Sequence, residues 1–155
     1  MSEGNQLTGY YFNPNIYPFE EYLKRLESAK KIAGMMNFPI ISSPYSPEKW
    51  MVGTAKLSQE PEGGKRCEVC FRIRLQGTYD YMQEIDFDIF ATTLTIGPQK
   101  SAETVNRIGR EIGGNKFLVR DFKKQGGFQH ANQLAKQFQI YRQNYCGCIY
   151  SIRKP

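Results

Sequence analysis

Two close pairs of cysteines are the residues of this sequence that are best suited to chemistry. Cys67 and Cys70 are separated by two residues, Cys146 and Cys148 by a single glycine, and the chain has no other cysteine. Thiolates at such spacings bind metals, and four of them suit tetrahedral zinc or an iron–sulfur cluster equally well. Spacing alone does not choose between these two, and a redox-active dithiol at Cys67 and Cys70 is a third interpretation.

The surroundings of the two pairs favour ligation. Cys67 and Cys70 fall at the start of a predicted helix, where free N–H groups and the helix dipole lower the pKa of a thiol. Nearby arginines add positive potential: Arg66, Arg72 and Arg74. In the second pair, Gly147 allows a tight backbone turn that directs both sulfurs to one side. We therefore expect all four cysteines to converge on one metal or redox centre.

Length and composition indicate one globular domain over residues 1–155, because 40% hydrophobic residues can form a core in a chain of this size. No apolar run approaches the roughly 20 residues of a membrane span, and the N-terminus lacks the basic and apolar regions of a signal peptide. These features predict a soluble cytoplasmic protein. Thiols usually stay reduced in that compartment, which favours metal binding over a disulfide bond without excluding the disulfide.

The chain is basic, with a net charge of +6 and 14% aromatic residues. Lysine and arginine neutralise phosphates, and aromatic rings stack on unpaired bases, so this composition suits a nucleic-acid partner. A basic protein without any such partner has the same composition, and composition does not separate the two.

The elements that must position these residues alternate between strands and helices. Short apolar and β-branched runs predict strands over residues 7–12, 38–42, 87–95 and 116–119. Helical periodicity predicts helices over residues 18–36, 48–56, 67–83, 101–112 and 129–138. This order is typical of an α/β fold with a parallel sheet covered by helices. Ligands of such sheets bind beyond the carboxyl ends of the strands, where polar loops follow at 13–15, 97–100 and 121–124.

Single residues in these loops are weaker candidates. Lys100 follows a predicted strand and could hold a phosphate, although a solvated turn lysine looks the same in sequence. Asp121 is a candidate catalytic or metal-binding carboxylate, or it caps a turn. Asp121 and Tyr141 are both candidate proton donors, and nothing in the sequence ranks them. His130, the sole histidine, is expected on the surface and has no assigned role.

Several motifs, taken in order, resemble the QueH family of epoxyqueuosine reductases. The similar segments are YFNPNI at 11–16, EEY at 20–22 with Arg25, EPEGGKRCEVC at 60–70 with Arg72 and Arg74, TTLT at 92–95 with Pro98 and Lys100, DFKK at 121–124, and YRQNYCGC at 141–148. Each segment is ordinary alone, but together they keep the family's order and cover nearly the whole chain.

The resemblance implies an oxidoreductase that performs the last step of queuosine synthesis. Epoxyqueuosine at the wobble position of tRNA would lose its epoxide oxygen as water, at the expense of two electrons and two protons. It also implies a Rossmann-like fold of the adenine-nucleotide-hydrolase (HUP) type with a 4Fe–4S cluster and an additional mononuclear metal, iron being the candidate. The electrons would come from a low-potential donor such as a ferredoxin.

The resemblance also assigns roles to residues. It makes Cys67, Cys70, Cys146 and Cys148 the ligands of the cluster region. It makes four basic residues candidates for contact with the substrate or its phosphates: Arg66, Arg72, Lys100 and Arg142.

Two departures from the family stand out. Gly97 stands where relatives commonly have serine, and the first strand and helix of the family, with their Cys-Cys motif, are absent. A wrongly assigned start at Met1 would explain the absence, and a genuine short form of the enzyme is the other explanation. In place of a reductase, the chain could be a non-catalytic, basic RNA-binding α/β domain with a structural four-cysteine zinc site.

Overall fold

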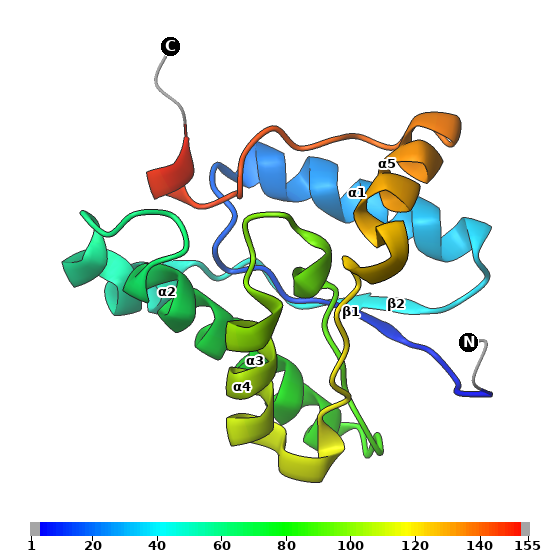
Figure 1. The fold of residues 1–155 in the computed structure, drawn as a ribbon, viewed down its shortest axis with the longest axis horizontal. Helices are drawn as coiled ribbons and strands as arrows, with labels where there is room; N and C mark the ends of the chain where they lie inside the picture. The colour runs from blue at the N-terminus through cyan, green and yellow to red at the C-terminus, as the bar shows by residue number, and fades with distance from the viewer. Residues whose placement is uncertain (1–3, 153–155) are drawn as a thin grey trace.

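A parallel two-stranded sheet lies between helices in this protein (Figure 1). The structure, a computed structural model, describes residues 4–152, so the proposed start at Met1 lies outside the described residues. Strand β1 (Gly9–Tyr11) pairs with β2 (Ile40–Ser42), and Gly9 lies opposite Ile40. The strands predicted over 7–12 and 38–42 are confirmed in shortened form, over 9–11 and over 40–42 at the end of the second range, and so is their parallel direction.

Helices α1 (Phe19–Met35) and α3 (Lys65–Glu84) cover opposite faces of this sheet. The ring of Tyr10 stacks on Tyr81 of α3, with centroids 4.3 Å apart. The ring of the next strand residue, Tyr11, meets Tyr22 of α1 edge-on at 5.2 Å. Successive strand residues point to opposite faces, so the two tyrosines fix one helix on each side.

Three further helices follow the predicted pattern. They are α2 (Glu48–Thr54), α4 (Ala102–Gly113) and α5 (Gly127–Gln137). Ser101 caps α4, because its hydroxyl accepts a hydrogen bond from the backbone N–H of Thr104 at 3.2 Å. All five helices expected from the periodicity are confirmed, with bounds shifted by a few residues. Within residues 4–152, no helix combines the length and the apolar character needed to cross a membrane.

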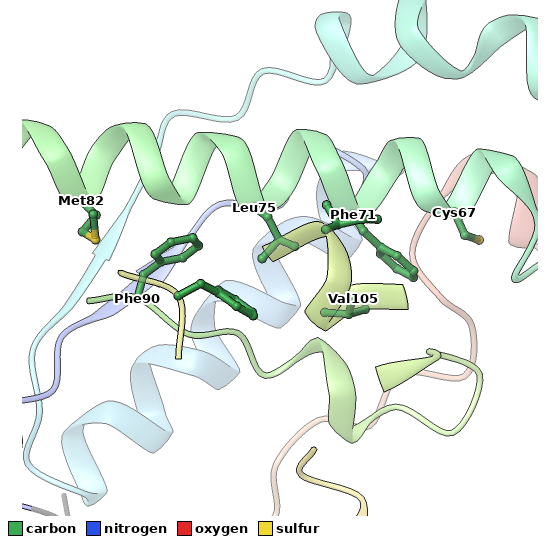
Figure 2. Close-up of a cluster of buried hydrophobic side chains, with 8 residues drawn as sticks. Cys67, Phe71, Leu75, Met82, Phe90 and Val105 are labelled. Carbon is green, nitrogen blue, oxygen red and sulfur yellow. The ribbon is translucent and has the colours of Figure 1, made fainter. Parts of the chain in front are cut away.

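The main hydrophobic core lies between α3 and α4 (Figure 2). Its buried members are Cys67, Phe71, Leu75, Met82, Phe90, Val105, Ile108 and Phe117. Glycines on α4 let the aromatic rings pack directly on the helix backbone: a Cβ at Gly109 would lie 2.3 Å from the ring of Phe117. Cys67 is therefore held by the same core that joins the two helices.

The strands predicted over 87–95 and 116–119 are wrong. Phe90 and Phe117 form a single isolated parallel bridge, and 3₁₀ turns occupy Leu94–Ile96 and Gly114–Lys116. Phe90 donates to the carbonyl of Lys116 and accepts from the N–H of Leu118, so each segment is paired around one residue. β-Branched and aromatic side chains favour extended backbone, but a strand needs a partner over several residues. The α/β class with a parallel sheet is confirmed, whereas the wider Rossmann-like architecture remains a prediction.

Candidate functional site: a four-cysteine pocket

All four cysteines line one pocket. Nine residues form its wall: Trp50, Arg66, Cys67, Cys70, Phe71, Arg74, Lys100, Cys146 and Cys148. They come from α2, from α3, from the loop before α4 and from the segment after α5. The fold thus brings together the two pairs that are distant in sequence. All four thiols are free, with no disulfide among them.

The first turns of α3 position Cys67 and Cys70. Helix α3 begins at Lys65, whose N–H is capped by the Glu60 carboxylate at 3.1 Å. The sulfur of Cys67 accepts a hydrogen bond from the N–H of Gly63 at 3.1 Å. Residues three apart share one face of a helix, so Cys70 lies one turn further along the same wall. The predicted placement of this pair at a helix start is confirmed.

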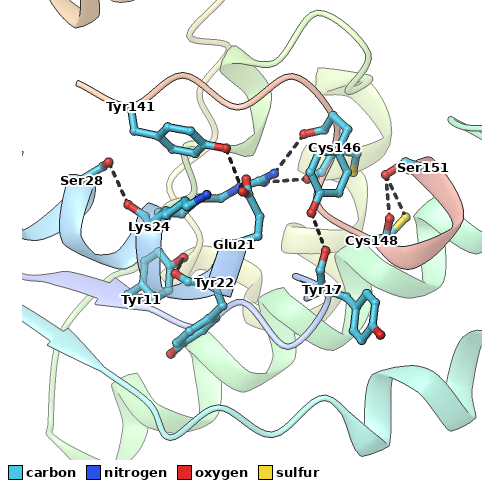
Figure 3. A network of polar contacts seen from close by, with 12 residues as sticks. Tyr11, Tyr17, Glu21, Tyr22, Lys24, Ser28, Tyr141, Cys146, Cys148 and Ser151 are labelled. Atoms are coloured by element: carbon cyan, nitrogen blue, oxygen red, sulfur yellow. Dashed lines mark hydrogen bonds and ion pairs between the residues drawn. The ribbon is translucent and has the colours of Figure 1, made fainter. Parts of the chain in front are cut away.

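The second pair lies on an irregular segment that a short 3₁₀ turn, Ile149–Ser151, anchors. The Ser151 hydroxyl donates to the carbonyl of Cys148 at 2.9 Å and lies 3.4 Å from the Cys148 sulfur (Figure 3). Cys148 is buried against Trp50 and Cys70. The two cysteine pairs therefore meet where the buried side chains of Cys70 and Cys148 pack in one cluster.

Lys100 places a positive charge beside Cys146 in the pocket. Its ammonium nitrogen lies 3.0 Å from the sulfur of Cys146 and 3.3 Å from the carboxylate of Glu62. Burial alone would lower the pKa of Lys100, but the neighbouring Cys146, Cys67 and Glu62 together outweigh burial and raise it. Lys100 is therefore charged at neutral pH, and the pocket contains a lysine–thiolate ion pair.

The thiols of the pocket differ in acidity. A hydrogen bond from Cys148 lowers the pKa of Cys146 most, and the charge of Lys100 lowers it further. The same hydrogen bond, together with burial, raises the pKa of Cys148. Burial likewise raises the pKa of Cys70. Within the second pair Cys146 therefore ionises before Cys148, and burial disfavours the thiolate of Cys70.

The chemistry of the pocket fits a sulfur-bound anionic group. One buried N–H donor of a wall residue, Arg66 Nε, has no hydrogen-bond acceptor, whereas the indole N–H of Trp50 is directed to the Cys70 sulfur. Such orphaned donors are costly unless a bound group supplies the acceptors. Thiolates and the sulfides of an iron–sulfur cluster are acceptors of this kind. In residues 4–152, however, no three Cys, His, Asp or Glu side chains are already arranged around a common point that could hold a metal ion.

Arg66, expected to contact the substrate, is buried in a structural position. Its Nη1 donates to the carbonyls of Leu57 and Ser58 at 3.1 Å, and also to that of Glu60. The guanidinium lies over the ring of Tyr150, 4.8 Å from the centroid. These contacts tie the 57–60 segment to α3, and contact with a substrate stays a prediction for this residue.

The other basic candidates lie in different surroundings. Lys100 is in the pocket, whereas Arg72 is exposed and pairs with Glu111 of α4. Arg142 is exposed and donates to the side chain of Asn132 at 3.1 Å. Of the four, the structure brings Lys100 and Arg66 to the cysteines, and it does not place Arg72 or Arg142 on the pocket wall.

The two candidate proton donors lie outside the wall of the cysteine pocket. Asp121 accepts from the N–H of Lys123 at 3.1 Å, a turn-capping contact. The hydroxyl of Tyr141 donates to Glu21 at 2.7 Å, and this hydrogen bond raises the pKa of the tyrosine (Figure 3). His130 is exposed, as expected. Proton donation by Asp121 or Tyr141 stays a prediction.

Sequence reasoning missed Trp50 and Phe71 as pocket residues. Phe71 had a usable signal, because positions 67, 70, 71 and 74 recur at helical spacing and share one face of α3. Trp50 had none, since its contact with Cys70 and Cys148 arises only when α2 packs beside α3.

Fold and pocket together define an α/β protein with a four-cysteine site. The chain belongs to the QueH family: it matches the family model described as epoxyqueuosine reductase QueH over residues 1–154. It is 35% identical to epoxyqueuosine reductase QueH of Streptococcus pyogenes serotype M1 over 162 aligned residues, and 36% identical to that of Thermotoga maritima over 149. The family expected from the motifs is confirmed.

These relatives are longer than the matched region. The alignment with the Streptococcus pyogenes protein covers 99% of this chain but 64% of that relative. The alignment with the Thermotoga maritima protein covers 92% of this chain and 78% of that relative. A third relative, epoxyqueuosine reductase QueH of Haemophilus influenzae, is 31% identical, and 64% of its length is covered. The chain therefore spans about two thirds to three quarters of these proteins.

Proposed function

We propose that this protein reduces epoxyqueuosine in tRNA to queuosine. The observation that carries the proposal is the convergence of all four cysteines on one pocket, in a chain that belongs to the QueH family. The reaction breaks both carbon–oxygen bonds of the epoxide and forms an alkene. Two electrons and two protons are consumed, and the oxygen leaves as water. The net charge of +6 suits a tRNA substrate.

Cys67, Cys70, Cys146 and Cys148 would hold a 4Fe–4S cluster, and a mononuclear iron would be a further metal. When bound, the cluster would supply the electrons, which a low-potential carrier such as a ferredoxin delivers. The orphaned Nε–H of Arg66 supports this assignment, because it could donate to sulfur. We expect the protein to act in the cytoplasm, where tRNA is modified and thiols stay reduced.

Lys100 is the best-supported substrate contact among the basic residues. Its charged nitrogen is held between the Cys146 sulfur and the Glu62 carboxylate, partly accessible at the wall of the pocket. A cation there can bind a phosphate group or stabilise the negative charge that develops on the epoxide oxygen. Arg72 and Arg142, on the exposed surface, are proposed to contact the tRNA backbone.

The proposal is tested by incubating the iron-loaded chain, under anaerobic conditions and with dithionite as electron source, with tRNA that carries epoxyqueuosine. Mass spectrometry of the digested nucleosides should show queuosine, which lacks one oxygen atom. A Cys146→Ser chain should leave the epoxide intact, and a Ser28→Ala chain, altered on α1 away from the wall of the cysteine pocket, should retain activity. Binding of tRNA without any loss of oxygen would contradict the proposal and leave an RNA-binding domain.

A further inference from the structure

We propose that Arg25 is the positioning residue that fixes the loop carrying Cys146 and Cys148. This inference deepens the proposed function and rests on it for its chemical meaning. Arg25 lies on α1, which contributes no residue to the wall of the cysteine pocket described above. Its guanidinium nonetheless reaches across: Nη1 donates to the carbonyl of Cys146 at 3.0 Å, and Nη2 donates to the carbonyl of Tyr145 at 3.1 Å.

Arg25 is itself held in one orientation. Its Nε donates to the Glu21 carboxylate at 2.7 Å, and the two side chains are only 10% and 8% exposed. The second oxygen of Glu21 accepts from the Tyr141 hydroxyl at 2.7 Å (Figure 3). The planar guanidinium therefore donates in fixed directions: Nε to Glu21 on α1, and Nη1 and Nη2 to the loop. A lysine ammonium cannot reproduce that fork.

The loop is shaped to accept this contact. Gly147 has a φ of +114°, and a Cβ at this position would lie 2.7 Å from Nη1 of Arg25. Its carbonyl accepts a hydrogen bond from the N–H of Tyr17 at 2.8 Å. The guanidinium of Arg25 also lies over the ring of Tyr145, with its Cζ 5.1 Å from the ring centroid. Glycine thus allows the backbone between the two cysteines to approach Arg25 closely.

Arg25 acts through the backbone of Cys146 and not through its sulfur. That sulfur is contacted by Lys100 at 3.0 Å and by the thiol of Cys148. Removing the Arg25 fork should release the loop while leaving all four thiols and their charged neighbour in the chain. Residues that orient metal ligands from outside the ligand shell commonly change metal affinity by about 10- to 100-fold.

The first test measures hydrogen exchange in the metal-free chain. In Arg25→Lys, the amide of Tyr17, which is bonded to Gly147, should exchange about tenfold faster or more, because the loop moves away. The amide of Met36, bonded within α1 to Ile32, should be unchanged and shows that the helix persists. Lys30→Gln, on the exposed side of α1, is the matched control. Unchanged exchange at Tyr17 in Arg25→Lys would overturn the proposal.

Gly147→Ala is a second variant for the case in which Arg25→Lys does not fold. Its added methyl group disturbs the same contact from the loop side, so exchange at the Tyr17 amide should also become faster. If Arg25→Lys fails to fold, normal exchange at Tyr17 in a folded Gly147→Ala chain would equally overturn the proposal.

The second test titrates the chain with Co²⁺ and records the thiolate-to-cobalt charge-transfer absorption. We expect binding to be about tenfold weaker in Arg25→Lys than in the unaltered chain. Equal affinity in a chain whose loop exchanges faster would reduce Arg25 to a structural residue and contradict the positioning role. Absence of cobalt–thiolate absorption in the unaltered chain would count against the proposed metal site instead, and the exchange data would still decide whether Arg25 holds the loop.

Discussion

At the scale of single residues, the ion pair of Lys100 and Cys146 sets the reactivity of the pocket. Cys146 is stabilised as a thiolate by a hydrogen bond from Cys148 and by the lysine charge 3.0 Å away. A thiolate is both the better nucleophile and the better metal ligand. Cys146 should therefore react or bind metal at a lower pH than Cys148 and Cys70, whose pKa values are raised.

Replacing Lys100 by methionine tests this electrostatic account. Without the ammonium group the pKa of Cys146 should rise, so its alkylation should begin at a higher pH. The measurement is the rate of iodoacetamide modification of Cys146 in the metal-free chain between pH 5 and 9, followed by peptide mass spectrometry. Lys136→Met, on the exposed surface of α5, is the control. An unchanged pH profile in Lys100→Met would show that the lysine does not act on this thiol.

Arg66 and Arg72 are equal candidates for substrate contact in the sequence, but their replacement should change the stability of the fold to different degrees. Arg66→Ala should lower the free energy of unfolding by about 2–3 kcal/mol, because three partly buried carbonyls lose a charged donor and the buried guanidinium is removed. Arg72→Ala should change it by less than about 1 kcal/mol, because its ion pair with Glu111 is exposed. Urea denaturation of both variants gives the comparison. Equal stability, with tRNA binding lost in Arg66→Ala alone, would restore Arg66 as a substrate contact.

At the scale of elements, α4 packs so closely on the bridged aromatic rings that its glycines leave no room for a side chain. Gly109→Ala would place a methyl group 2.3 Å from the ring of Phe117 and should destabilise the chain by about 1–3 kcal/mol. Gly34→Ala, on the exposed side of α1 where a Cβ meets nothing within 4 Å, should be neutral or stabilise by about 0.5 kcal/mol. Thermal denaturation separates these outcomes, and a neutral Gly109→Ala would contradict the described packing.

Helices were predictable from sequence because each carries its own pattern. The apolar stripe of α1 and the Ser101 cap of α4 are local features that need no partner. The segment around Phe90 has equally clear β-forming residues, but whether it forms a strand depends on the length of the segment that pairs with it. It pairs only around Phe117 and therefore forms a bridge and not a strand.

At the scale of the whole molecule, the fold joins cysteines from distant parts of the chain in one pocket. Their convergence could be predicted, because two chelating pairs in one domain suggest a common centre. The residues that support them could not: Trp50 and Arg25 approach the pairs through tertiary packing alone. The contact of Arg25 with the Cys146 carbonyl involves a backbone atom, which no residue pattern reveals.

Iron and acid-labile sulfide per chain most directly test the proposal that the four cysteines hold one iron–sulfur cluster. After anaerobic purification or reconstitution, we expect iron and sulfide in near-equal amounts, about four of each. Zinc alone, or a chain that retains neither iron nor sulfide, would contradict the account.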